Sequence, residues 1–397
     1  MKDYTREDIR FVMKTEMIVG QGSAKNLPKM LRDRGWPRIA IVVDSGVLKH
    51  NSYAQEIIEI LSKNLDETVI VPCEMAEPTY DYLDKVKAQY IEGKQFDCVV
   101  GIGGGSTMDL SKGLATLATN PGKGLQYRGF GKVVIPPLPV VALPTTAGTG
   151  SEVTPYAVFI DTTERWKFGI NTEHNYPRLA VYDPGFLDSC PAKIYASSGM
   201  DAMTHTLESF VAKNATAVSR IFSVKAFELL FPNLKKIAAG DRSSETKLGL
   251  LLGSGCAGIA LMNAGAGPAG ALSYPLGVYF EVPHGIAGSV FLPGVIQFNV
   301  AHGYTDYAQL YDRIPDAKSG LSDAQKSLAF ADEIKNLSDS LGIPTELAGF
   351  GVKTEADTRL IIDNAWQLKL AFEQNPIPFG KAEIEDLVLS LGNCKKA

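Results

Sequence analysis

Short runs of aliphatic and β-branched residues alternate with amphipathic stretches through the first half of the chain. Residues 51–64 and 82–94 carry apolar side chains at helical spacing. Strands that alternate with helices need crossover connections, so this pattern predicts an α/β domain with a mostly parallel sheet. Ligands of such sheets bind at the carboxyl ends of the strands. The strand-like runs are residues 39–43, 69–72, 97–102, 138–143 and 179–182.

The pattern changes from about Pro191, where strand-like runs become scarce and long helical stretches follow one another. The second half is therefore predicted to be an all-helical domain. Pro184, Gly185 and Pro191 punctuate the chain at this change. We accordingly expect an α/β domain over residues 1–188 and a helical domain over residues 189–397, to which the motifs below assign dinucleotide binding and metal and substrate binding, respectively. The helical stretches are residues 199–213, 217–239, 245–263, 322–341, 355–371 and 381–391.

Composition excludes several other classes of protein. The 397 residues suffice for two ordinary domains, and the net charge of -5 argues against a nucleic-acid partner. The five cysteines are scattered and form no CxxC, which is typical of reduced thiols in the cytoplasm. Residues 1–8 are charged and unlike a secretory signal, and the apolar run 248–262 is too short for a membrane span. We expect a cytoplasmic protein without a membrane partner.

A glycine-rich loop, residues 101–109, directly follows a strand-like run and opens a helical one. Glycines let the backbone turn sharply and let a diphosphate approach the amides, and the helix N-terminus adds a positive dipole end. Ser106 can add a hydroxyl donor, whereas Asp109 is better suited to orient its neighbours or to meet the nicotinamide side. The alternative is a turn without a ligand, which four glycines within five positions argue against.

Two further features suit a dinucleotide. Residues 144–154 form a second loop of small residues after a strand, and its hydroxyls and amides can line the phosphates, ribose or nicotinamide. Asp44 ends the strand-like run 39–43, where a carboxylate can accept hydrogen bonds from the adenosine ribose and repel a 2′-phosphate. This favours NAD over NADP. The alternative interpretation of Asp44 is a helix or turn cap.

An Asp and a His four residues apart, Asp201 and His205, lie in a helical stretch. This spacing places a carboxylate oxygen and an imidazole nitrogen side by side, as two ligands of one divalent metal. Such a pair is common by chance and can also be an ordinary core or surface pair. The upstream nucleotide loop and the downstream Pro283-His284-Gly285 turn favour the metal.

Six motifs follow one another along the chain, at residues 103–106, 144–154, 199–205, 263–265, 274–277 and 283–285. Together they resemble the iron-containing, or group III, alcohol dehydrogenases, and the resemblance runs from about Thr15 to the C-terminus. It implies an N-terminal Rossmann-like domain, a helical C-terminal domain and an active site in the cleft between them. It also implies a dimer or larger homo-oligomer that interconverts alcohols and aldehydes or ketones with NAD(P) and a divalent metal, Fe²⁺ or Zn²⁺.

The resemblance also implies roles for single residues. Asp201, His205 and His284 match three metal ligands, and Asp44 matches a position used in coenzyme choice. Lys167 matches a lysine that reaches the cofactor ribose. The remaining matches place the cofactor along Gly103, Gly104, Gly105, Ser106, Thr145, Thr146 and Thr149.

The sequence departs from this family pattern at two positions. Gly270 stands where the family usually carries a fourth ligand, a His, and Tyr274 stands where a second His is often assigned to proton relay. Three ligands can still hold a metal with open positions. Alternatively, Asp201, His205 and His284 form a hydrogen-bonded cluster without metal, and a protonated His or Tyr274 polarises the carbonyl. The gap at Gly270 also leaves room for a bulkier, polyhydroxylated substrate.

These features predict a NAD-dependent oxidoreductase that interconverts an alcohol, for example a sugar-derived one, and its carbonyl partner. An alternative of another class is a lyase or cyclase similar to dehydroquinate synthase, which shares this architecture and uses NAD transiently. The sparse histidines and residues 274–277 argue against it. A third interpretation is a NAD-binding relative without metal or catalysis.

Overall fold

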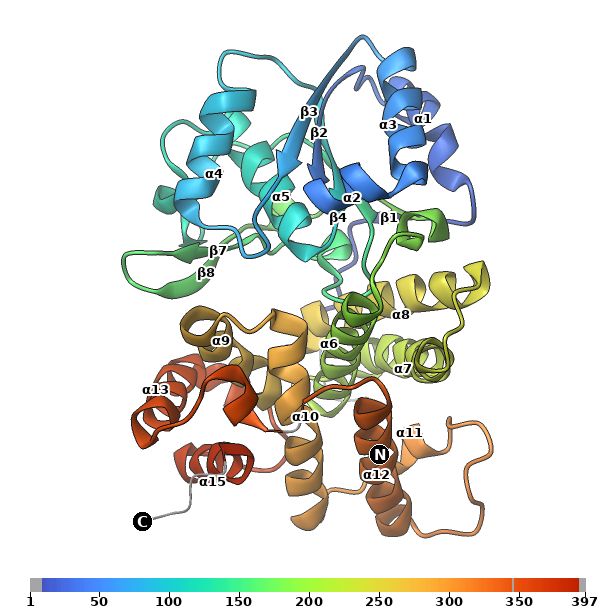
Figure 1. The fold of residues 1–397 in the computed structure, drawn as a ribbon, viewed down its shortest axis with the longest axis vertical. Coiled ribbons are helices and arrows are strands. Elements are labelled where there is room, and N and C mark those ends of the chain that lie inside the picture. The colour runs from blue at the N-terminus through green and yellow to red at the C-terminus, as the bar shows by residue number, and fades with distance from the viewer. Residues whose placement is uncertain (1–8, 345, 393–397) are drawn as a thin grey trace. The chain divides into compact units, whose positions relative to one another are not determined.

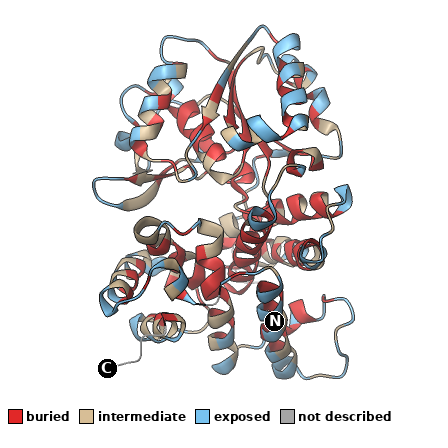
Figure 2. Ribbon diagram, in the orientation of Figure 1, coloured by how far each residue is buried: buried red, intermediate tan, exposed pale blue. Residues whose placement is uncertain are grey.

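Six parallel strands form the main sheet of a computed structural model that describes residues 9–344 and 346–392 (Figure 1). Their order across the sheet is β1-β9-β6-β4-β2-β3. The inner strands β4, β6 and β9 are buried along their whole length, as expected for aliphatic runs covered on both faces (Figure 2). The strands are β1 (Glu16–Val19), β2 (Arg38–Asp44), β3 (Glu67–Cys73), β4 (Cys98–Gly103), β6 (Val140–Pro144) and β9 (Leu179–Tyr182).

Helices flank this sheet on two sides, with α1 and α3 on one and α4 and α5 on the other (Figure 1). A π-helical turn, Lys87–Ile91, prolongs α4. A small second sheet has the order β5-β8-β7, in which β7 and β8 form an antiparallel pair. The elements are α1 (Leu27–Asp33), α2 (Ser45–His50), α3 (Ser52–Asn64), α4 (Tyr80–Val86), α5 (Gly105–Thr119), β5 (Gly129–Phe130), β7 (Val158–Asp161) and β8 (Trp166–Asn171).

The described residues after Tyr182 form helices and turns and contain no strand. Helix α6 packs against α7, α9 and α10 and is buried along almost all of its length, and α9 packs against α10 (Figure 2). The helices are α6 (Ala192–Val211), α7 (Ala217–Ala238), α8 (Ser244–Ala264), α9 (Pro268–Phe280), α10 (His284–Ala301), α11 (Ala308–Tyr311), α12 (Asp323–Ser340), α13 (Glu355–Ala365), α14 (Lys369–Glu373) and α15 (Lys381–Gly392). The predicted fold class, a parallel α/β part followed by a helical part, is confirmed.

The chain divides into two compact units. A sheet unit comprises residues 13–191 and 242–251, and a helical unit comprises the described residues of 9–12, 192–241 and 252–397. The single division between residues 188 and 189 stays a prediction, and so do the expectations for residues 1–8 and Cys394, which lie outside the described part.

One described helix, α8, is long and apolar enough by composition to cross a membrane. In the structure, 61% of its apolar window is buried. Gly253 explains part of that packing, because a Cβ at this position would lie 2.7 Å from Leu230 Cγ of α7. The glycine thus lets α8 pack closely on α7.

Candidate active site

The predicted nucleotide loop lies at the point where the strand order of the main sheet reverses. The chain runs from β2 to β3 in one direction and then from β4 to β6 in the other, and β2 and β4 are neighbours, with Val43 opposite Ile102. Ligands of open α/β sheets bind at such a switch point, beyond the carboxyl ends of the strands. Asp44 and Gly103 are the last residues of these two strands. The two predicted cofactor positions therefore lie side by side at the carboxyl ends of β2 and β4.

The two predicted cofactor loops contact each other through their glycines. A Cβ at Gly104 would lie 3.0 Å from Thr146 Oγ1, and a Cβ at Gly105 would lie 2.6 Å from Thr149 Cγ2. The amide of Thr145 donates to the carbonyl of Gly103 over 3.0 Å. Bulkier residues at the glycine positions would therefore push the loops apart. The geometry explains why glycine is needed here, independently of any ligand.

Helix α5 begins at Gly105, directly beyond this contact. Its N-cap residue, Gly104, has no side chain, and the helix start has no side-chain cap. The Ser106 hydroxyl donates to the carbonyl of Ala76. A 15-residue helix without a capping side chain presents N–H groups and a positive dipole end, which suits an anionic diphosphate.

A buried ion cluster fastens the second loop to α5. Lys112 Nζ donates to the carbonyl of Ser151 at 2.6 Å, to its Oγ at 2.7 Å and to the carbonyl of Tyr156 at 2.8 Å. Ser151 Oγ in turn donates to Asp109 Oδ1 over 2.9 Å. Burial lowers the pKa of Lys112 to about 8 and raises the pKa of Asp109. The contacts of Asp109 are thus those of a residue that orients its neighbours.

Two other predicted cofactor residues bond to groups of the protein itself. Asp44 Oδ1 accepts a hydrogen bond from the Val47 amide over 2.9 Å and so caps α2. Lys167 Nζ lies 2.6 Å from Glu77 Oε2. Both interpretations of Asp44 agree with its position, since one carboxylate oxygen suffices for the cap. The roles of Asp44 and Lys167 toward the cofactor stay predictions.

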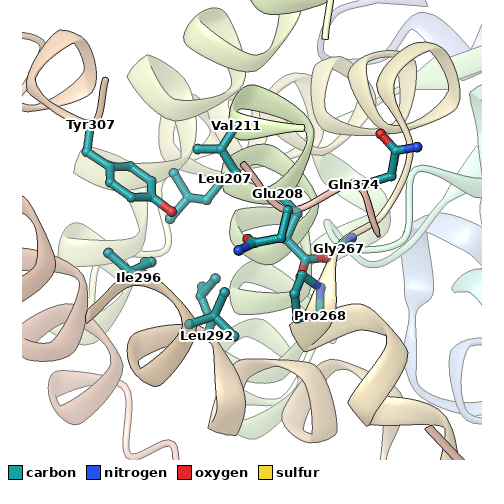
Figure 3. A pocket seen from close by; sticks show the side chains of 11 residues that line it. Leu207, Glu208, Val211, Gly267, Pro268, Leu292, Ile296, Tyr307 and Gln374 are labelled. Atoms are coloured by element: carbon teal, nitrogen blue, oxygen red, sulfur yellow. Dashed lines mark hydrogen bonds between the residues drawn. The ribbon is translucent and has the colours of Figure 1, made fainter. Parts of the chain in front are cut away.

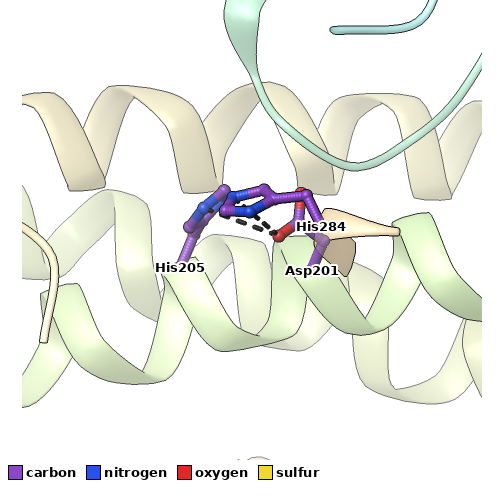
Figure 4. Close-up of side chains that lie close together, drawn as sticks. All are labelled: Asp201, His205 and His284. Carbon is purple, nitrogen blue, oxygen red and sulfur yellow. Dashed lines mark ion pairs between the residues drawn. The ribbon is translucent and has the colours of Figure 1, made fainter. Parts of the chain in front are cut away.

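Asp201, His205 and His284 converge within the helical unit (Figure 4). Asp201 Oδ1 lies 3.7 Å from His205 Nε2 and 3.9 Å from His284 Nε2. Asp201 and His205 come from adjacent turns of α6, and His284 is the first residue of α10. The three ligand atoms all lie within 4.8 Å of one another. These distances are too long for hydrogen bonds and leave space for an ion between the three atoms.

Gly285 allows His284 to reach this position. A Cβ at Gly285 would overlap the carbonyl oxygen of Ser197 and lie 3.2 Å from Asp201 Cβ. The start of α10 therefore approaches α6 more closely than any residue with a side chain would permit. Glycine at position 285 of the Pro-His-Gly run is therefore needed for this packing.

The triad fits a divalent cation. One carboxylate and two imidazoles are a common ligand set for Zn²⁺ and for Fe²⁺. His205 faces Asp201 with Nε2, whereas its Nδ1 is buried and has no hydrogen-bond partner among the described residues, so no described side chain orients this ring from behind. His284 Nδ1 lies 3.1 Å from Ser273 Oγ, so a second group orients that ring, as is usual around metal ligands. Tyr274 packs edge-to-face on His284, with ring centroids 5.8 Å apart.

Glu208 occupies the space beside Gly270. Its carboxylate accepts hydrogen bonds from the amides of Gly267 at 2.9 Å, Ala269 at 2.7 Å and Gly270 at 3.2 Å. A Cβ at Gly270 would lie 3.0 Å from Glu208 Oε2. Burial raises the pKa of Glu208, whereas these three backbone donors lower it. A buried carboxylate thus holds the N-terminus of α9 at Gly270, the position where the resemblance led us to expect a fourth ligand.

A small cavity lies beside Glu208 and is lined mostly by apolar side chains (Figure 3). Its volume of about 10 Å³ is enough for one water molecule and too small for a substrate. Tyr307 and Gln374 supply polar groups to its lining. The cavity is therefore an internal packing feature and not the substrate site.

Sequence reasoning missed three residues of these clusters: Lys112, Glu208 and Ser273. Lys112 lies three residues after Asp109, and Glu208 lies seven after Asp201, so both follow a predicted residue on one helical face. That spacing could have singled them out. Ser273 gave no such signal, because its partner His284 belongs to the next helix.

Two family profiles match the chain. "Iron-containing alcohol dehydrogenase" matches residues 14–184, and "Fe-containing alcohol dehydrogenase family, C-terminal" matches residues 195–391. The chain belongs to the iron-containing alcohol dehydrogenases. This iron-containing alcohol dehydrogenase is thus a NAD-dependent oxidoreductase that interconverts an alcohol and its carbonyl partner. The lyase alternative is not favoured.

Individual relatives are similar to this alcohol dehydrogenase over most of its length. It is 32% identical to the NAD-dependent methanol dehydrogenase of Bacillus methanolicus over 92% of the chain and 95% of the relative. It is 35% identical to the 1,3-propanediol dehydrogenase of Klebsiella pneumoniae over 73% of the chain and 75% of the relative. A crystal structure of 1,3-propanediol oxidoreductase superposes with a TM-score of 0.90 at 27% identity, covering 97% of the chain and 100% of that structure.

Proposed function

We propose that Asp201, His205 and His284 hold one divalent cation, Fe²⁺ or Zn²⁺, and that this site binds the substrate oxygen during alcohol oxidation and aldehyde or ketone reduction. The convergence of the three ligand atoms within 4.8 Å carries this proposal. A cation bound there supplies Lewis-acid polarisation of that oxygen. With three protein ligands, open positions remain for a substrate or a water molecule.

The residues of the chain then divide the work. In the oxidation, the substrate oxygen would lose the hydroxyl proton and the carbinol carbon would lose a hydride, for which NAD, when bound, would supply the acceptor. Tyr274, packed on the His284 ring, is the proposed relay for the hydroxyl proton. Asp201, His205 and His284 would fix the position of the substrate oxygen through the cation that they hold. The carbinol C–H bond would then point in one direction, toward the hydride acceptor.

The proposed NAD site uses the switch point of the sheet. Gly103, Gly104, Gly105 and Ser106 receive the diphosphate at the start of α5, because the uncapped N–H groups there suit an anion. Thr145, Thr146 and Thr149 lie along the cofactor, on the loop that contacts these glycines. Asp109 orients this loop through Ser151, and Lys167 reaches the ribose. Asp44 favours NAD over NADP in this proposal. Use of NADP by the enzyme would contradict this role of Asp44.

We propose a small primary or secondary alcohol as substrate. The relatives named above act, by their names, on methanol and 1,3-propanediol. Gly270 contributes no imidazole beside the triad and so leaves room for a bulkier substrate. We therefore include a polyhydroxylated, sugar-derived alcohol among the proposed substrates. We further propose that the enzyme is cytoplasmic and assembles as a homodimer or higher homo-oligomer.

The test is turnover by protein purified without chelator, then stripped of metal, then reloaded with Fe²⁺ or Zn²⁺. Methanol, 1,3-propanediol and a polyol are assayed with NAD, and the corresponding carbonyl compounds with NADH. We expect turnover that is lost on stripping and regained on reloading. Unimpaired turnover by the metal-free protein would exclude the cation. Product formed without net NADH would instead indicate lyase chemistry.

A further inference from the structure

We propose that Ser273 is a positioning residue, which fixes the His284 ring as the tautomer that carries its proton on Nδ1 and thereby aims Nε2 at the cation site. Ser273 lies on α9 and is almost completely buried. Its hydroxyl lies between two groups, the carbonyl of Gly270 at 2.6 Å and His284 Nδ1 at 3.1 Å.

Counting protons assigns the direction of both hydrogen bonds. A serine hydroxyl has one proton to donate, and a carbonyl oxygen can only accept. The shorter contact, to Gly270, therefore takes the hydroxyl proton. Ser273 Oγ must then accept from His284, so Nδ1 of that ring carries the hydrogen. Nε2 is left with a lone pair, and it is this nitrogen that lies 3.9 Å from Asp201 Oδ1.

The acceptor in this chain of contacts is itself held in place. The carbonyl of Gly270 belongs to the first turn of α9. The amides of Ala269 and Gly270 in this turn, and that of the N-cap residue Gly267, all donate to the buried Glu208. Glu208 therefore fixes the peptide groups that orient Ser273, and Ser273 orients His284. The residue that lacks the ligand side chain contributes a backbone oxygen to this support.

The support matters more at a site with three ligands than at one with four. A metal-ligand His normally donates its second N–H to a fixed acceptor, and removing such an acceptor weakens metal binding by about 10- to 100-fold. Here no fourth protein ligand at position 270 can compensate for a ring that rotates or changes tautomer. This inference rests on the proposed cation site, although its tautomer part does not require a cation.

The experiment compares Ser273→Ala with Ser273→Thr, which keeps a hydroxyl, in the full chain. Affinity for Zn²⁺ and Co²⁺ is measured by competition with a chromogenic chelator. We expect the Ala variant to bind about 10- to 100-fold more weakly and the Thr variant to regain most of the affinity. Ser289→Ala is the matched control, because its buried hydroxyl donates to the carbonyl of Gly285 within the same helix as His284.

A second measurement reads the tautomer in metal-free protein. The chain has five histidines, so ¹⁵N spectra of histidine-labelled protein are simple, and a His284→Gln variant assigns the His284 signals. At a pH where the ring is neutral, we expect a protonated Nδ1 in the unmodified protein and in Ser289→Ala. Ser273→Ala should give a mixture of tautomers.

The outcomes separate the two proposals. Unchanged affinity and an unchanged tautomer in Ser273→Ala would overturn the role of Ser273. A protonated Nε2 on His284 in the unmodified protein would overturn it as well. If the unmodified protein binds neither cation but shows the Nδ1-protonated ring, the cation site fails while the assignment of Ser273 stands.

Discussion

The nucleotide loop and the triad are built in opposite ways. Around Gly104 and Lys112, consecutive residues of two loops pack on each other, and the buried polar groups bond one another. Around Asp201, ligands from α6 and α10 meet at distances beyond hydrogen bonding. The two loops hold each other in place without a ligand, and only the start of α5 is left uncapped, whereas the three side chains of the triad leave space for an ion between them.

The largest expected effect tests this contrast at the triad. Asp201→Ala removes the carboxylate shared by both ion-pair contacts. We expect kcat/KM for an alcohol with NAD to fall by about 10³-fold or more, since Lewis-acid polarisation contributes several kcal/mol. The matched control is Thr206→Ala on the same helix, whose hydroxyl bonds the carbonyl of Ala202. Full activity in a folded Asp201→Ala protein would place the reaction elsewhere.

An intermediate effect is expected when the missing ligand is restored. Gly270→His should tighten binding of Zn²⁺ on the order of tenfold, because a fourth protein ligand is added. Gly270→Ala places the same Cβ 3.0 Å from Glu208 Oε2 without an imidazole and so controls for crowding. Both variants are compared by chelator competition and by thermal midpoint. If His binds no more tightly than Ala, the triad does not receive a ligand from position 270.

The smallest expected effect concerns Asp44 at the carboxyl end of β2 and its influence on coenzyme preference. Asp44→Gly should shift the ratio of kcat/KM values toward NADP by about fivefold, the equivalent of roughly 1 kcal/mol of repulsion. Because Asp44 also caps α2, the variant should lose some stability. Asp44→Asn retains a cap oxygen and removes the charge, so it should show the coenzyme shift with less destabilisation. An unchanged ratio in both variants would leave Asp44 as a cap alone.

Sequence patterns predicted the parts of the fold whose signals are local. The β2, β4 and β9 strands were read from aliphatic runs, and the glycine loop from adjacent residues. Helices α9 and α10 were missed. Both are apolar on all sides and each contains an internal proline, Pro275 or Pro293, so neither shows the one-sided pattern of an amphipathic helix.

In the candidate site, too, the sequence predicted contacts within one helix but not contacts between helices. Asp201 and His205 share one helix, so their spacing alone predicted that they lie together. The contact of Ser273 with His284, and of Glu208 with the start of α9, depends on how separate helices pack. Spacing carries no information about such contacts, because the connecting turn decides which residues meet.

The overlap that Gly285 avoids has a consequence for any redesign of this enzyme. A side chain at position 270 would meet Glu208 Oε2 at 3.0 Å, and the end of the Glu208 side chain can shift. Position 285 offers no such freedom, because any larger residue would strike the carbonyl of Ser197 and shift the first turn of α10. Libraries that randomise the whole Pro-His-Gly segment would thus return inactive clones for a steric reason, and engineering effort belongs on the residues around it.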